Sequence, residues 1–184
     1  MLMKMLAAGG LPVMTDQIRT ADAENPQGYF EFERVKDLKK DNDKSWVRGA
    51  RGKAIKVISH LLIELPAENY YRIILAQRNL SEVILSQNTM LRRRGEMNPG
   101  DDEKTTELYK KHLIKVRRLI DVSFNMELLE VGYKDVLDNP RLCAERINLF
   151  VGGMLNTEKM SRVVDHQLYR NRSDDTHTFN ATSN

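Results

Sequence analysis

The stretch YRIILAQRNLSEVILSQ, residues 71–87, joins a short apolar run to a helix-like pattern. The apolar run at residues 73–76 is continuous rather than alternating, which is typical of a strand that is covered on both faces. Polarity changes at Gln77, and apolar residues return at helical spacing from Leu80 onward. The stretch therefore predicts a buried parallel strand that leads into a helix.

Arg78 comes directly after this predicted strand, where ligands of open α/β sheets bind. Asn79 or Ser81 can cap the following helix, and Glu82 suits its positive N-terminus. A guanidinium offers phosphate a planar fork of donors, and Ser86, eight residues on, adds a neutral donor. An arginine in this position is also typical of a surface or ion-paired residue, so both interpretations stay open.

Composition describes an ordinary globular chain. Its 184 residues suffice for one domain with a core, and 30% are charged while 41% are hydrophobic. The net charge of +3 is small and interleaved, which argues against a nucleic-acid partner. No apolar stretch is long enough to span a membrane. The single cysteine, Cys143, fits a reducing compartment, so we expect a cytoplasmic protein in which Cys143 is a core residue.

The same periodicities predict further elements along the chain. Helices are expected over residues 2–8 (ended by Gly9 or Gly10), over residues 103–122, and from Asn139-Pro140 to Gly152-Gly153; strands are expected over residues 54–58 and 126–131. Gly132-Tyr133 is expected to start a turn, and Leu142, Cys143, Ile147, Phe150 and Val151 to face the core. The charged segment 36–53 indicates either a solvated surface or a region that attracts an anion. Residues 1–172 are predicted to form one domain, and residues 173–184 a mobile tail.

Residues 52–87 resemble the P-loop sulfotransferase family. The resemblance is carried by AIKVISHLLIELP, residues 54–66, and by the stretch quoted above, with its strand, arginine and later serine. Further similarity appears in the Asn-Pro-Gln-Gly-Tyr segment at residues 25–29, in EVGYKDVLDNPRLCAERINLFVGG, and in VVDHQLYRNR. Similarity therefore extends, in the family's order, over most of residues 1–172.

This resemblance implies an α/β fold, a parallel sheet with flanking helices, and 3′-phosphoadenosine 5′-phosphosulfate as co-substrate without a metal. Arg78 and Ser86 would hold the 3′-phosphate of that nucleotide. His60 is the candidate for the general base, although Ile58-Ser59-His60 stands where the family often carries Lys-Thr-His, and Lys56 lies two residues too early. The expected partner is an unidentified small-molecule or other sulfate acceptor with a hydroxyl or amine.

One part of the family pattern is missing from the sequence. The family's first strand and its glycine-rich phosphate loop would precede Met1, and no GxxxxGK[ST] motif occurs elsewhere. An N-terminally truncated sulfotransferase fold is therefore expected, deficient in catalysis as it stands. Two alternatives stay open: a non-catalytic remnant that binds a nucleotide or a protein, and a small-molecule kinase in which Glu130 would hold Mg²⁺. The four histidines are scattered, without metal-ligand spacing.

Overall fold

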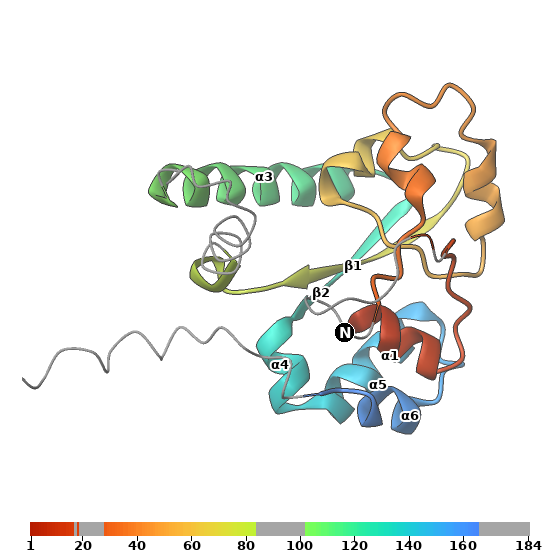
Figure 1. Ribbon diagram of the computed structural model, residues 1–184, viewed down its shortest axis with the longest axis vertical. Coiled ribbons are helices and arrows are strands. Elements are labelled where there is room, and N and C mark those ends of the chain that lie inside the picture. The colour runs from red at the N-terminus through yellow and green to blue at the C-terminus, as the bar shows by residue number, and fades with distance from the viewer. Residues whose placement is uncertain (17, 19–27, 84–101, 166–184) are drawn as a thin grey trace, which may run out of the picture.

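A two-stranded parallel sheet lies at the centre of the chain. The computed structural model describes residues 1–16, 18, 28–83 and 102–165. Strand β1 (Tyr71–Gln77) pairs with strand β2 (Met126–Gly132), from Tyr71 opposite Met126 to Gln77 opposite Gly132. Helices flank the sheet on both sides, as Figure 1 shows. The α/β class and the strands predicted over residues 73–76 and 126–131 are thus confirmed.

Helix α3 (Asp102–Val122) covers one face of the sheet. Because β1 and β2 are parallel, the chain must cross over between them, and α3 lies in that connection. Val116 and Ile120 of α3 are buried beside Leu62, which lies in the 3₁₀ helix η3 (Ser59–Glu64). Alternate strand residues complete this cluster: Ile73, Leu75, Met126 and Leu128. The helix predicted over residues 103–122 is confirmed.

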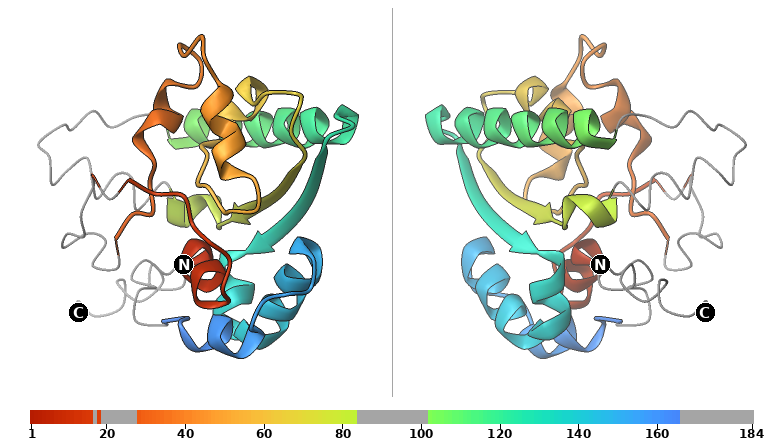
Figure 2. Two further views of the ribbon diagram at one scale, coloured as in Figure 1. Left: turned by 90° about the vertical axis from the view of Figure 1, so that its right-hand side faces the viewer. Right: turned by 90° about the vertical axis from the view of Figure 1, so that its left-hand side faces the viewer.

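Four helices pack against the opposite face: α1 (Leu2–Ala8), α4 (Tyr133–Asp138), α5 (Pro140–Val151) and α6 (Thr157–Arg162). Their core contains Met5, Ile147 and Met160, which are fully buried, and Ile74 of the sheet packs against it. Figure 2 shows this helical layer on the other side of the strands from α3. Neighbouring residues of β1 therefore face different clusters, which explains why its apolar run is continuous.

Helix α1 ends where the sequence predicts. Gly9 follows its last residue, and the carbonyl of Gly9 accepts a hydrogen bond from the amide of Asn156 at 2.9 Å. A Cβ atom on Gly9 would lie 2.7 Å from Cγ of Met160, so this close approach requires glycine. The contact joins α1 to α6, near the two ends of the described chain.

The strand predicted over residues 54–58 is wrong as a ladder strand. It is reduced to a single parallel bridge between Val13 and Ala54. The Ala54 amide donates to the Pro12 carbonyl at 2.8 Å, and the Ala54 carbonyl accepts from Met14 at 2.8 Å. Pro12 has no N–H to extend the ladder, and the chain after Met14 turns away to bond the segment around Glu31.

A third small core lies beneath two further 3₁₀ helices, η1 (Glu33–Asp37) and η2 (Ser45–Ala50). Val35, Leu38 and Val47 are buried there, and the rings of Phe32 and Trp46 pack 5.3 Å apart. Several cations of the charged segment pair with carboxylates, including Lys44 with Glu64 at 3.0 Å and Arg48 with Glu68 at 3.8 Å. The solvated-surface interpretation fits these ion pairs.

Two predictions around α5 need correction. The chain does not turn at Gly132-Tyr133 but enters α4 directly. Gly132 is the N-cap of this short helix, and Tyr133 is its first residue. Leu142 is 57% exposed rather than buried, whereas Cys143 and Ile147 face the core. The stop at Gly152 is confirmed by its left-handed conformation, with φ of 117°. Among the helices of the described residues, none is both long and apolar enough to cross a membrane.

Candidate functional site

The carboxyl ends of the two strands bring Arg78 and Tyr133 together. Gln77 lies opposite Gly132 in the ladder, so the next residues of both strands leave the sheet at the same edge. The guanidinium carbon of Arg78 lies 4.1 Å from the centre of the Tyr133 ring. This distance fits a cation–π contact, in which the guanidinium face rests on the ring.

The chain after Arg78 begins a helix, as predicted. Oδ1 of Asn79 accepts hydrogen bonds from the Ser81 amide at 3.0 Å and from the Ser81 hydroxyl at 2.7 Å. Residues 80–83 are helical, and the Val83 amide donates to the Asn79 carbonyl at 3.1 Å. Asn79 is therefore the cap, one of the two candidates that the sequence offers. Ser86, the other residue predicted for the 3′-phosphate, lies outside the described residues.

Two further positive groups, Lys4 of α1 and Lys56, act electrostatically on the same group as Arg78. The pKa of the Met1 amino group is lowered, first by burial and then by the positive charges of Lys56, Lys4 and Arg78. The N-terminus is marked beside the carboxyl ends of the strands in Figure 1. Three cationic side chains from separate segments thus contribute positive potential at the Met1 amino group.

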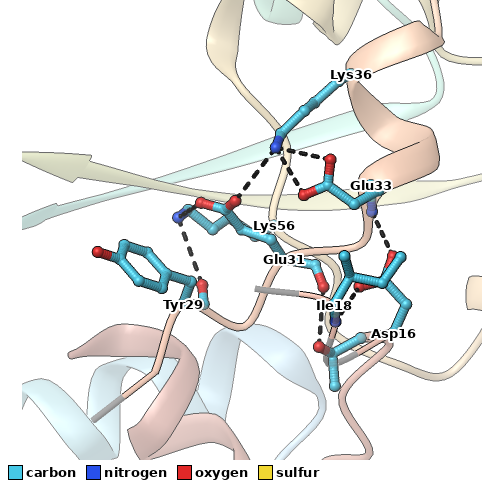
Figure 3. Close-up of polar contacts among 8 residues, drawn as sticks. Asp16, Ile18, Tyr29, Glu31, Glu33, Lys36 and Lys56 are labelled. Atoms are coloured by element: carbon cyan, nitrogen blue, oxygen red, sulfur yellow. Dashed lines mark hydrogen bonds and ion pairs between the residues drawn. The ribbon is translucent and has the colours of Figure 1, made fainter. Parts of the chain in front are cut away.

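Lys56 is exposed and pairs with the carboxylate of Glu31. Its ammonium donates to Oε1 of Glu31 at 2.9 Å, and Lys36 lies 3.6 Å from Oε2 of the same carboxylate. Figure 3 shows Lys36 and Lys56 both turned toward Glu31.

Asp16 is hydrogen-bonded to the start of η1, since its Oδ2 accepts from the Glu33 amide at 2.6 Å. This bond is the main cause that lowers the pKa of Asp16.

His60 lies in η3, on the α3 side of the molecule. Its ring stacks on His112 of α3, with centres 3.9 Å apart and planes at 11°. The Ser59 hydroxyl and Nε2 of His112 form a hydrogen bond of 2.8 Å. Burial lowers the pKa of His112, and the charges of His60 and Lys115 lower it further. Within the described part of the chain, no recorded contact joins His60 to Arg78, so the two predicted site residues are not brought together directly.

Glu130, the residue considered for Mg²⁺, is held by two side chains of neighbouring elements. Arg117 of α3 donates to Oε1 at 2.5 Å, and the Gln77 amide donates to Oε2 at 2.5 Å. The Arg117 hydrogen bond is the largest cause that lowers the pKa of Glu130. Residues 1–16, 18, 28–83 and 102–165 contain no group of three or more potential metal ligands.

Tyr133 is the site residue that sequence reasoning missed. The sequence pattern assigns it only to a turn, although it directly follows β2 as Arg78 directly follows β1. That equivalence can be inferred from the sequence once the two strands are predicted to be parallel neighbours. Pairing the residues that follow neighbouring strands could therefore have found it.

Comparisons with protein-family models, with curated proteins and with solved structures found no match for the chain. The resemblance to P-loop sulfotransferases therefore stays a prediction that rests on the quoted motifs.

Proposed function

We propose that the carboxyl edge of the sheet binds a nucleotide with a 3′-phosphate, and that the chain is a sulfotransferase-like protein. The donor would be 3′-phosphoadenosine 5′-phosphosulfate, and the acceptor a hydroxyl or amine. The observation that carries this proposal is the position of Arg78, exposed directly after a parallel strand and stacked on Tyr133. Sulfuryl transfer depends on positioned positive charge, as phosphoryl transfer does.

The other side chains at this edge support the same class of ligand. After burial, the positive charges of Lys56, Lys4 and Arg78 each lower the pKa of the Met1 amino group, so all three act on one point. A nucleotide with phosphates at its 3′ and 5′ positions carries two separated anionic ends. We assign Arg78 and Ser86 to the 3′-phosphate, and Lys4 and Lys56 to the neighbourhood of the 5′ group.

Calorimetry with 3′-phosphoadenosine 5′-phosphate and with adenosine 5′-phosphate tests the proposal. The Arg78→Ala variant is expected to lose about 10- to 100-fold in affinity for the bisphosphate, as for a lost charge-assisted hydrogen bond. Its affinity for adenosine 5′-phosphate should be unchanged. Arg72→Ala is the matched control, because Arg72 lies on β1, the strand that Arg78 follows, but is paired with Glu127 at 3.6 Å. Equal binding of both nucleotides by the wild-type chain would overturn the proposal.

A second candidate is a binding protein of the same class that transfers nothing. The placement of His60 favours it, because the ring of this candidate base is stacked on His112 of α3. Incubation with the sulfate donor and a panel of phenols and amines separates the two functions. Release of 3′-phosphoadenosine 5′-phosphate that depends on an acceptor supports the transferase, and tight binding without release supports the binding protein.

A further inference from the structure

Arg78 is held differently from two other arginines that contact the sheet. Arg117 donates to the carboxylate of Glu130, and Arg72 lies beside that of Glu127. Within the described residues, the recorded contact of the Arg78 guanidinium is the Tyr133 ring, 4.1 Å away. A carboxylate partner uses N–H donors and neutralises the charge, whereas a ring partner touches only the face of the guanidinium.

We propose that Tyr133 is a positioning residue, which holds Arg78 flat while leaving its donor edge open for a phosphate ester. The inference rests on the proposed function and names a second residue of the same site. An exposed arginine has many rotamers, and binding an anion orders them at an entropic cost. Stacking on Tyr133 supplies part of that order before the anion arrives.

The fold makes this arrangement a consequence of strand register. Gln77 and Gly132 are the last pair of the ladder, so Arg78 and Tyr133 leave the sheet next to each other, where they make contact. Tyr133 is also the first residue of α4, whose Val136 and Leu137 are buried. The ring is therefore attached to a packed element, and a ring so placed can orient a side chain that is itself exposed.

The test compares Tyr133→Phe, which keeps the ring, with Tyr133→Leu, which removes it. In the calorimetric assay Tyr133→Leu should weaken binding of 3′-phosphoadenosine 5′-phosphate about two- to fivefold, the range of an exposed cation–π contact. Tyr133→Phe should bind like the wild-type chain, and binding of adenosine 5′-phosphate should not change. A general loss of structure would weaken both nucleotides and would be visible in circular dichroism.

A second readout separates this inference from the proposed function. In arginine-labelled protein, the Arg78 Nε–H resonance should carry a ring-current shift that is kept in Tyr133→Phe and lost in Tyr133→Leu. Titration with inorganic phosphate should move this resonance in the wild-type chain, and at higher phosphate concentration in Tyr133→Leu. If no 3′-phosphate dependence is found but these phosphate responses are, the proposed function fails and the positioning role stands. A resonance that ignores phosphate, or equal responses in both variants, would overturn the role of Tyr133.

Discussion

At the scale of single residues, anion binding depends on which donors each side chain has already used. Arg78 meets a ring, while Lys56 meets the carboxylate of Glu31. We therefore expect Arg78 to contribute more to anion binding than Lys56. Lys56→Gln should weaken binding of the bisphosphate less than Arg78→Ala does, and calorimetry on both variants checks this order. A larger loss in Lys56→Gln would show that the Glu31 pair opens for the ligand.

Ser86 offers a second prediction at this scale. If it helps to hold the 3′-phosphate, Ser86→Ala should lose about two- to tenfold in affinity for 3′-phosphoadenosine 5′-phosphate, as for one neutral hydrogen bond. Adenosine 5′-phosphate serves as the ligand control, and Ser81→Ala as the variant control, since Ser81 bonds to Asn79. Equal losses for the two nucleotides would remove Ser86 from the 3′-phosphate site.

At the scale of elements, Glu130 links β2 to α3 through Arg117. The pKa of Glu130 lies below its ordinary value of 4.5, so its charged form favours the folded state. This stabilisation is complete above the ordinary pKa and is lost as pH falls through the lowered one. Glu130→Gln should cost about 0.5–1 kcal/mol at pH 7, as for a partly exposed pair, and less near pH 3. Urea unfolding followed by circular dichroism measures both. Glu145→Gln, at the exposed Arg141 pair on α5, should cost less at pH 7; an equal cost would contradict the special position of Glu130.

The contact between η3 and α3 makes a second pH prediction, this time for a histidine. His112 stacks on His60 and forms a hydrogen bond with Ser59, and its pKa is lowered mainly by burial and less by the charges of His60 and Lys115. The unfolded chain binds more protons between this lowered pKa and the ordinary value of 6.5, so stability should rise with pH across that window. His112→Phe keeps a stacking ring but removes the titration. The loss of stability between pH 7.5 and pH 5.5 should therefore be smaller in this variant than in the wild type, and an unchanged loss would rule out His112 as its source.

The elements show where sequence reasoning succeeds and where it stops. The two ladder strands, α1, α3 and α5 follow from apolar periodicity and from end signals such as Gly9 and Pro140. The segment at residues 54–58 is as apolar as a strand but forms only one β-bridge, between Ala54 and Val13. Its own sequence cannot show whether a neighbouring strand is present to pair with it. The place of Arg78 follows from its position directly after a strand. The place of Tyr133 follows only when the residues after the two parallel strands are paired, since its contact with Arg78 depends on register between distant residues.

At the scale of the whole molecule, α1 and α6 close the helical layer through Gly9 and Met160. A methyl group on Gly9 would lie 2.7 Å from Cγ of Met160, while the φ of Gly9, −71°, suits any residue. Gly9→Ala should therefore destabilise the fold by about 1–3 kcal/mol through overpacking alone. Gly49→Ala is the control, because nothing lies within 4 Å of its Cβ position, and it should change stability by less than about 0.5 kcal/mol.

A double-mutant cycle of Gly9 and Met160 tests whether the cost of Gly9→Ala comes from the clash between these two residues. In a Met160→Ala background the methyl group introduced at position 9 would find space, so Gly9→Ala should cost less there than in the wild-type chain. Thermal unfolding of the wild type, the two single variants and the double variant gives this coupling. Equal costs in both backgrounds would mean that Gly9 acts through something other than its contact with Met160.

Arg78 is expected to make the carboxyl edge of the sheet selective for a 3′-phosphate, and the proposed function depends on that selectivity. It is measured by the ratio of the dissociation constants for adenosine 5′-phosphate and 3′-phosphoadenosine 5′-phosphate, in the wild-type chain, Arg78→Ala and Arg72→Ala. We expect a ratio well above one in the wild type and in Arg72→Ala, and a ratio close to one in Arg78→Ala. A ratio that survives the loss of Arg78 would show that this arginine does not read the 3′-phosphate.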